Sequence, residues 1–161
     1  MIRVIVAFAI AFLVSATTTY SGDAGAKWMR SHSFRCKSWG GTPVDGSYGL
    51  QNDSSNDYMT AVCEVNNTDY MPISTVASLN LHGYVGWASG LCAKTCRAYY
   101  DGGGTCGSQT CNSTAGERTV SPSVSGWSNG AYDFPYLWVS LAYRHDVNGP
   151  TLIRGIYMAD Q

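Results

Sequence analysis

Residues 91–111 read LCAKTCRAYYDGGGTCGSQTC and give the strongest structural signal in the chain. The DGGG stretch at 101–104 is a turn signal with strand-like runs on both sides. Across an antiparallel hairpin, paired positions have a nearly constant sum of residue numbers. That sum differs by only one between Cys96 paired with Cys106 and Cys92 paired with Cys111. The stretch therefore predicts one hairpin with two nested disulfides, in which a bulge accommodates the extra residue.

The cysteine count fits a disulfide framework. The chain has six cysteines, an even number, and in an oxidising compartment they predict three disulfides, with Cys36 paired to Cys63 by elimination. A zinc site is the alternative, but the spacings within 92–96 and 106–111 lack the C-x2-C knuckle of structural zinc ribbons. A catalytic thiol would need a lowered pKa and a nearby base. We therefore expect all six cysteines to be structural.

Residues 1–16 have the three parts of a secretory signal peptide: a basic residue, an apolar run at 4–14 and small residues at 15–16. The run is shorter than the ~20 residues that a transmembrane helix needs, and an uncleaved N-terminal anchor is the alternative. Cleavage after Ala16 leaves residues 17–30 as a leader or edge strand and residues 31–161 as the domain. We expect the mature protein to be exported, to the extracellular space or the cell surface, without a transmembrane segment.

The composition indicates a β protein that does not bind nucleic acid. Only 13% of the residues are charged and the formal net charge is −1, so no basic field would hold nucleic acid. After residue 16 no stretch has convincing helical periodicity, and Gly, Ser, Thr, Asn and Tyr favour strands joined by turns. The strand candidates are residues 48–50, 59–65, 76–85, 91–100, 118–120, 136–144 and 151–158. Their spacing predicts an all-β, single-domain, disulfide-stapled antiparallel β-sandwich of jelly-roll-like form.

The connections between these strands are also predicted. Residues 136–144 and 151–158 flank a turn at 146–150, so we expect them to form a C-terminal hairpin. Residues 102–130 are rich in Gly, Ser and Thr, and we expect them to run across the surface between strands.

The order of these features is similar to that of a known group of proteins. Cys36 follows a short leader, residues 48–52 read YGLQN, a strand ends at Val62-Cys63, and a cysteine-bearing hairpin and a hydrophobic terminal hairpin follow. Over roughly residues 30–160, this order resembles small exported single-domain β-sandwich proteins of bacteria. Pro72 departs from the pattern, because it lies well downstream of the second cysteine. The resemblance implies secretion and a sandwich fold, and it supplies no catalytic residue.

The sequence contains no recognised catalytic motif. There is no G-x-S-x-G elbow, H-E-x-x-H helix or phosphate-binding loop. We expect His82 to pack on the face of a sheet and His145 to be a solvated turn residue, and His32 lies in the leader. Residues 45–57 offer enough oxygen ligands for calcium, although Asn, Asp and Ser are also ordinary turn formers. We therefore expect no enzymatic activity and no cofactor, with calcium as the alternative.

Aromatic residues are abundant: 11 Tyr, 5 Trp and 4 Phe. Trp39, Trp87 and Trp127 adjoin Gly or Ser, as in exposed loops, which makes them the candidate ligand-binding residues. Trp138 lies among aliphatic residues, and we expect it in the core. Exposed Trp and Tyr stack on sugar rings and are also enriched at protein interfaces.

These observations predict a secreted, non-catalytic structural or interaction protein, whose partner is itself or another extracellular protein. The alternative is a carbohydrate-binding module that holds a glycan with its exposed Trp and Tyr side chains. A small secreted hydrolase is the third hypothesis.

Overall fold

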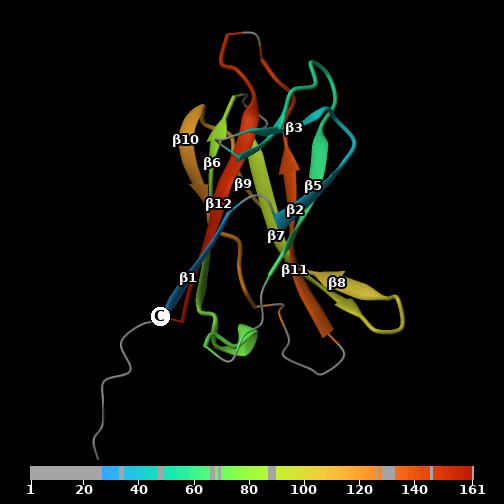
Figure 1. Ribbon diagram of the computed structural model, residues 1–161, viewed down its shortest axis with the longest axis vertical. Coiled ribbons are helices and arrows are strands. Elements are labelled where there is room, and N and C mark those ends of the chain that lie inside the picture. Colours follow the sequence, from blue (N-terminus) through green and yellow to red (C-terminus); the bar gives the residue numbers. More distant parts are fainter. Residues whose placement is uncertain are drawn as a thin grey trace, which may run out of the picture.

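Two antiparallel β-sheets lie face to face in the computed structural model (Figure 1). The described residues are 27–32, 35–46, 49–65, 68, 70–86, 90–125, 127, 133–145 and 147–160. The first sheet contains β1 (Trp28–His32), β3 (Pro43–Gly46), β4 (Gly49–Asn52), β6 (Ser78–Val85), β10 (Gly116–Val120) and β12 (Thr151–Ala159). The second sheet contains β2 (Cys36–Trp39), β5 (Met59–Glu64), β7 (Leu91–Tyr99), β8 (Gly104–Cys106), β9 (Thr110–Asn112) and β11 (Asp133–Leu141). The predicted all-β sandwich is confirmed.

The strands alternate between the sheets along the chain. The first sheet has the order β10-β6-β12-β4-β3, with β1 also on β12, and the second has β2-β5-β11-β7-β8, with β9 also on β7. From β4 to β12, each strand lies in the opposite sheet from the one before it, apart from the β7–β9 segment. This alternation is the arrangement of a double-sheet jelly roll, as predicted.

All three predicted disulfides are present. Cys96 pairs with Cys106 in the register of β7 and β8, and Cys92 pairs with Cys111 in the register of β7 and β9. Between the two registers the ladder shifts by one residue, and the Gly107 N–H donates to the carbonyl of Thr95 at 2.8 Å. The disulfides Cys36–Cys63, Cys92–Cys111 and Cys96–Cys106 therefore staple the second sheet. Figure 1 shows β8 and its turn projecting from the body of the domain.

The core lies between the two sheets and follows the period of two in the strands. Leu137, Val139 and Leu141 of β11 in the second sheet are fully buried. Leu81 and Val85 of β6 in the first sheet are buried in the same core. Side chains at the intervening positions point away from the core, because successive residues of a strand face opposite sides of its sheet.

The predicted C-terminal hairpin is wrong. The turn does close, since the N–H and C=O groups of His145 and Gly149 bond each other at 3.1 and 2.7 Å. Beyond the turn the two strands separate: β11 pairs with β5 and β7, whereas β12 pairs with β6, β4 and β1. Both edges of β11 are therefore already filled inside the second sheet.

Residues 102–130 contain more strand than the predicted surface connection: β10 includes the candidate strand 118–120, and the second arm of the cysteine hairpin is divided into β8 and β9. These strands are only three to five residues long, so their sequences are too short to show clear alternation. Their positions are set by non-local pairing with β7 and β6.

The end of the N-terminal leader forms an edge strand. One side of β12 is shared: β4 pairs with residues 151–153 and β1 pairs with residues 155–159. Hydrogen bonds continue past the strand, since the backbone N–H of Lys27 donates to Oδ1 of Asp160 at 2.7 Å. The predicted signal peptide at 1–16 lies outside the described residues. Among the described residues, no helix has the length and apolar character needed to span a membrane.

Asn52 connects the two sheets. Its side chain is fully buried at the end of β4, and its Nδ2 donates to the carbonyls of Leu141 and Ala142, both at 3.3 Å, at the end of β11. The same Nδ2 donates to the Asp57 carbonyl at 2.7 Å, and Oδ1 accepts from the Ser54 N–H at 3.1 Å. A buried amide satisfied in this way holds segments far apart in sequence in one arrangement.

Candidate ligand-binding face

The second sheet presents an aromatic surface on its outer side, away from the core. Phe134, Tyr136 and Trp138 occupy alternate positions of β11, where Leu137 and Val139 are buried, and Trp39 lies on the outer side of β2. We call the surface formed by these four residues the aromatic face. Phe134 and Trp39 are 56% and 58% exposed, which is unusual for side chains of this size.

A groove of about 340 Å³ lies in the aromatic face. Its volume is within the range of small-molecule sites, roughly 300–1,000 Å³. The lining residues come from β2, β5, β7 and β11 and from the residue before β2; they are Arg35, Lys37, Trp39, Val62, Glu64, Ala98, Phe134, Pro135 and Tyr136. Under the groove, β11 pairs with β7 at Phe134 and Pro135 and with both β5 and β7 from Tyr136 onward, so this backbone is held in the sheet.

Charged side chains surround the aromatic rings. Lys94 places its Nζ 4.5 Å from the ring centroid of Trp138, so a cation covers that indole. Arg35, Lys37 and Glu64 line the groove itself. The surface therefore combines apolar ring faces with strong hydrogen-bond donors and one carboxylate acceptor, a combination suited to binding a polyhydroxylated ligand.

The predicted ligand-binding tryptophans have different positions. Trp39 is exposed, as its Ser and Gly neighbours indicated, and it lines the groove, but it lies in strand β2 and not in a loop. Trp127 is partly buried against the core, and its Nε1 donates to the carbonyls of Cys96 and Tyr136 at 3.1 and 3.3 Å, so its indole N–H is used inside the molecule. Trp87 lies outside the described residues.

Trp138 is not in the core, contrary to the prediction. It occupies the outer position between Leu137 and Val139, whose side chains point inward. Sequence reasoning also missed Phe134 and Tyr136 as site residues. The signal was available, because the period of two that buries Leu137 places residues 134, 136 and 138 together on the outer side.

The oxygen-rich segment proposed for calcium is organised by its own hydrogen bonds. Oγ of Ser54 accepts from the Asp57 N–H at 3.0 Å, and the Asp53 carboxylate forms an ion pair of 2.7 Å with Arg144. Within the described part of the chain, no three His, Cys, Asp or Glu residues gather where they could hold a metal ion. His82 lies on the outer side of β6, and His145 lies in the turn before β12.

Comparison with protein-family models and with curated proteins finds no match to this sequence. The site must therefore be interpreted from its own chemistry.

Proposed function

We propose that this chain is an exported, non-catalytic binding protein of the extracellular space or cell surface, and that the aromatic face binds a polysaccharide. The observation that supports the proposal is the groove between Trp39, Phe134 and Tyr136, in which two large rings are more than half exposed. Fold alone does not define function, because sandwiches of this kind have many unrelated activities.

The spacing and rigidity of the rings favour a chain-like ligand. Alternate residues of a strand are about 7 Å apart, so Phe134 and Tyr136 present neighbouring rings in the groove, and Trp138, covered by Lys94, is the next in the row. The C–H face of a sugar ring packs on an aromatic ring, and the charged groups of Lys37 and Glu64 can bond its hydroxyls. Phe134 and Tyr136 are attached to β11, an inner strand, which lowers the ordering cost of binding, whereas Trp39 is on the outermost strand β2.

The cysteines support the extracellular part of the proposal. Among the described residues every cysteine is in a disulfide, which fits an oxidising compartment. The predicted signal peptide agrees with this location. The mass of the exported protein tests whether the signal peptide is removed, because cleavage after Ala16 would leave a chain that begins at Thr17.

The binding proposal is tested with residues 17–161 on immobilised cellulose, chitin, xylan and mannan. We expect retention on at least one polymer, and we expect Trp39→Ala or Phe134→Ala to weaken it about tenfold or more. Tyr70→Ala is the matched control, because Tyr70 is 57% exposed and lies outside the groove. Absence of retention on all four polymers, or equal retention of the Trp39 variant, would contradict the proposal.

Self-assembly is the second candidate function. The observation in its favour is that β1, an outermost strand, pairs with β12 alone among the described strands, so its other edge can accept a further strand. Size-exclusion chromatography with light scattering on residues 17–161, with and without calcium, distinguishes the candidates. A stable oligomer would support assembly, whereas a monomer would support the binding proposal.

A further inference from the structure

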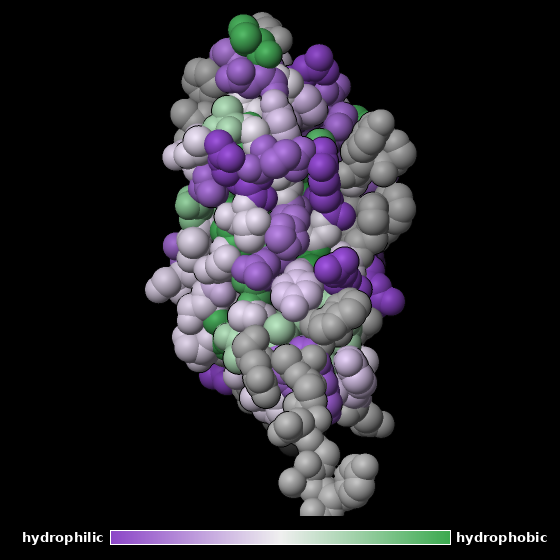
Figure 2. All heavy atoms as spheres, turned by 90° about the vertical axis from the view of Figure 1, so that its left-hand side faces the viewer, coloured by the Kyte–Doolittle hydropathy of each residue, from purple (hydrophilic) through white to green (hydrophobic). Residues whose placement is uncertain are grey.

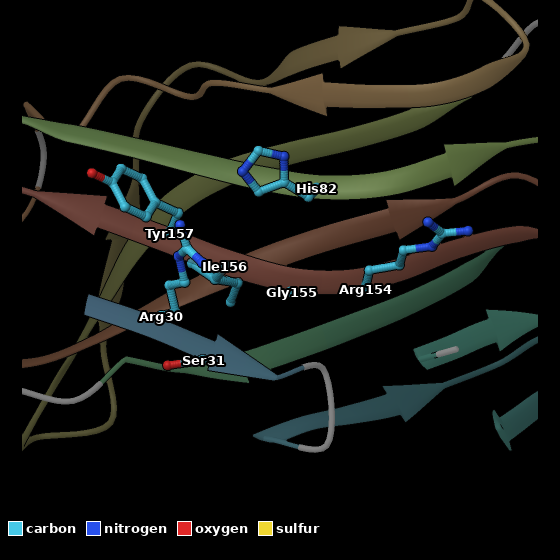
Figure 3. Close-up of a pocket in the computed structure, with 7 residues that line it drawn as sticks. All are labelled: Arg30, Ser31, His82, Arg154, Gly155, Ile156 and Tyr157. Carbon is cyan, nitrogen blue, oxygen red and sulfur yellow. The ribbon is translucent and has the colours of Figure 1, made fainter. Parts of the chain in front are cut away.

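A second groove, of about 560 Å³, crosses the outer side of the first sheet. It is lined by Arg30 and Ser31 of β1, His82 of β6, and Arg154, Gly155, Ile156 and Tyr157 of β12 (Figure 3). Figure 2 views the side of the molecule on which β10 and β12 lie in Figure 1, and hydrophilic residues cover much of it. This groove and the aromatic face are on opposite sheets.

The groove exists because of an irregularity in β12. The register between β12 and β6 shifts between Ile153 and Gly155, so Arg154 is the extra residue of a bulge. Gly155 follows and has no side chain to fill the space beside His82, its partner across the strands. A Cβ on Gly155 would lie 2.9 Å from the carbonyl oxygen of Ser31, so glycine also allows β1 to approach.

Cationic side chains stand at both ends of this groove. Figure 3 shows Arg30 next to Tyr157 near one end and Arg154 at the other, with His82 between them. The Arg30 guanidinium lies 5.8 Å from the Tyr157 ring centroid. His82 Nδ1 lies 3.0 Å from Oγ1 of Thr119, so its other ring nitrogen, Nε2, is the one available to a ligand.

The described residues that line the groove carry two guanidinium groups, those of Arg30 and Arg154. None of the described residues that line it is acidic. Beside the groove, Glu117 of β10 forms a 2.6 Å ion pair with Arg154. Both partners are about half exposed, at 47% and 58% for Arg154 and Glu117. A cationic groove on a chain with a net charge of −1 is a local concentration of positive charge.

The geometry points to a binding site for an anionic polysaccharide, one with carboxylate or sulfate groups on successive sugars. Two guanidinium groups at opposite ends suit repeated anions better than a single small ion. The groove lies on the face of a sheet, where an extended peptide cannot add as a strand, since strand addition requires an edge. Tyr157, Ser31 and His82 can meet sugar rings and hydroxyls. This inference does not rest on the proposed function of the aromatic face.

The test measures binding of residues 17–161 to heparin, polygalacturonate and poly-glutamate by calorimetry at low and moderate salt. We expect heparin or polygalacturonate to bind with an affinity that falls as salt rises, and poly-glutamate to bind more weakly. Arg30→Gln and Arg154→Gln should each weaken binding about tenfold. Glu117→Gln should strengthen binding, because it releases Arg154 from its ion pair.

The matched control is Arg97→Gln, which removes one positive charge from the β7–β8 hairpin, outside the groove. It should bind as the unaltered protein does. Three results would overturn the inference: no binding of either polysaccharide, equal weakening by Arg97→Gln, or poly-glutamate binding as tightly as the polysaccharides. Trp39→Ala should leave this binding unchanged, so failure here and failure of the proposed function are distinguishable.

Discussion

At the scale of single residues, Asn52 has the largest expected effect on stability. Replacing it with Ala would leave buried backbone groups of Ser54, Leu141 and Ala142 without their partner. Each unsatisfied buried group costs about 1–3 kcal/mol, although some will find water, so we expect Asn52→Ala to lower the free energy of unfolding by about 2–4 kcal/mol. Chemical denaturation measures the change.

Asn112→Ala is the matched control for this prediction, because both hydrogen bonds of the Asn112 side chain are exposed: Nδ2 donates to the Thr119 carbonyl at 3.4 Å, and Oδ1 accepts from the Thr114 N–H at 3.2 Å. Its cost should be within about 0.5 kcal/mol. Equal stability of the two variants would show that Asn52 does not join the sheets. Both residues begin Asn-x-Ser/Thr triplets, but the buried Asn52 is inaccessible to glycosylation in the folded protein.

The role of Asn52 in joining the sheets could not be predicted from the sequence, because its partners at the end of β11, Leu141 and Ala142, lie 89 and 90 residues away. The exposure of Trp39 could be predicted, because the Ser and Gly residues on either side of it are typical of an exposed position. The same local rule failed for Trp127, whose burial depends on contacts with Cys96 and Tyr136. Neighbouring residues in sequence describe the local backbone, whereas burial depends on what packs against it.

At the scale of elements, the three disulfides should differ in the stability they confer. Cross-linking stabilises mainly by restricting the unfolded chain, and the effect grows with loop length. The sequence separations are 27 for Cys36–Cys63, 19 for Cys92–Cys111 and 10 for Cys96–Cys106. Paired Cys→Ser variants should therefore lose stability in that order, with about 1 kcal/mol between the first and the last.

Denaturation of the three double variants measures this order, and the unaltered oxidised protein is the reference. Cys63 is fully buried and Cys106 is exposed, so burial also makes the loss of Cys36–Cys63 more destabilising than the loss of Cys96–Cys106. If loss of Cys96–Cys106 lowered the stability most, the prediction would be wrong, and loop length would not determine how much each disulfide stabilises the fold.

The two hairpin predictions show what a turn signal can and cannot specify. The cysteine hairpin was predicted correctly because its turn and its cross-links are all within residues 92–111. The turn before β12 was also recognised, and it does close at His145 and Gly149. The strands on either side of it enter different sheets, because the edges of β11 are occupied by β5 and β7. A turn reverses the chain, but non-local pairing decides which strands meet.

At the scale of the whole molecule, β1 covers an edge that would otherwise be exposed. Residues 155–159 of β12 pair with β1 on one side and β6 on the other, and Met29 of β1 packs against the core. Removing β1 would leave a run of backbone N–H and C=O groups unpaired next to buried Ile156 and Met158. Bare edges of this kind recruit strands from other molecules.

A chain of residues 33–161 should therefore form concentration-dependent oligomers and unfold at a lower denaturant concentration than residues 17–161. Light scattering after size-exclusion chromatography measures the first effect. A synthetic peptide of residues 27–32 should reverse both, because it can pair with the free side of β12, and a peptide with the same residues in scrambled order is the control. A truncated chain that stays monomeric and equally stable would show that β1 is dispensable, and that the jelly roll is complete without the leader.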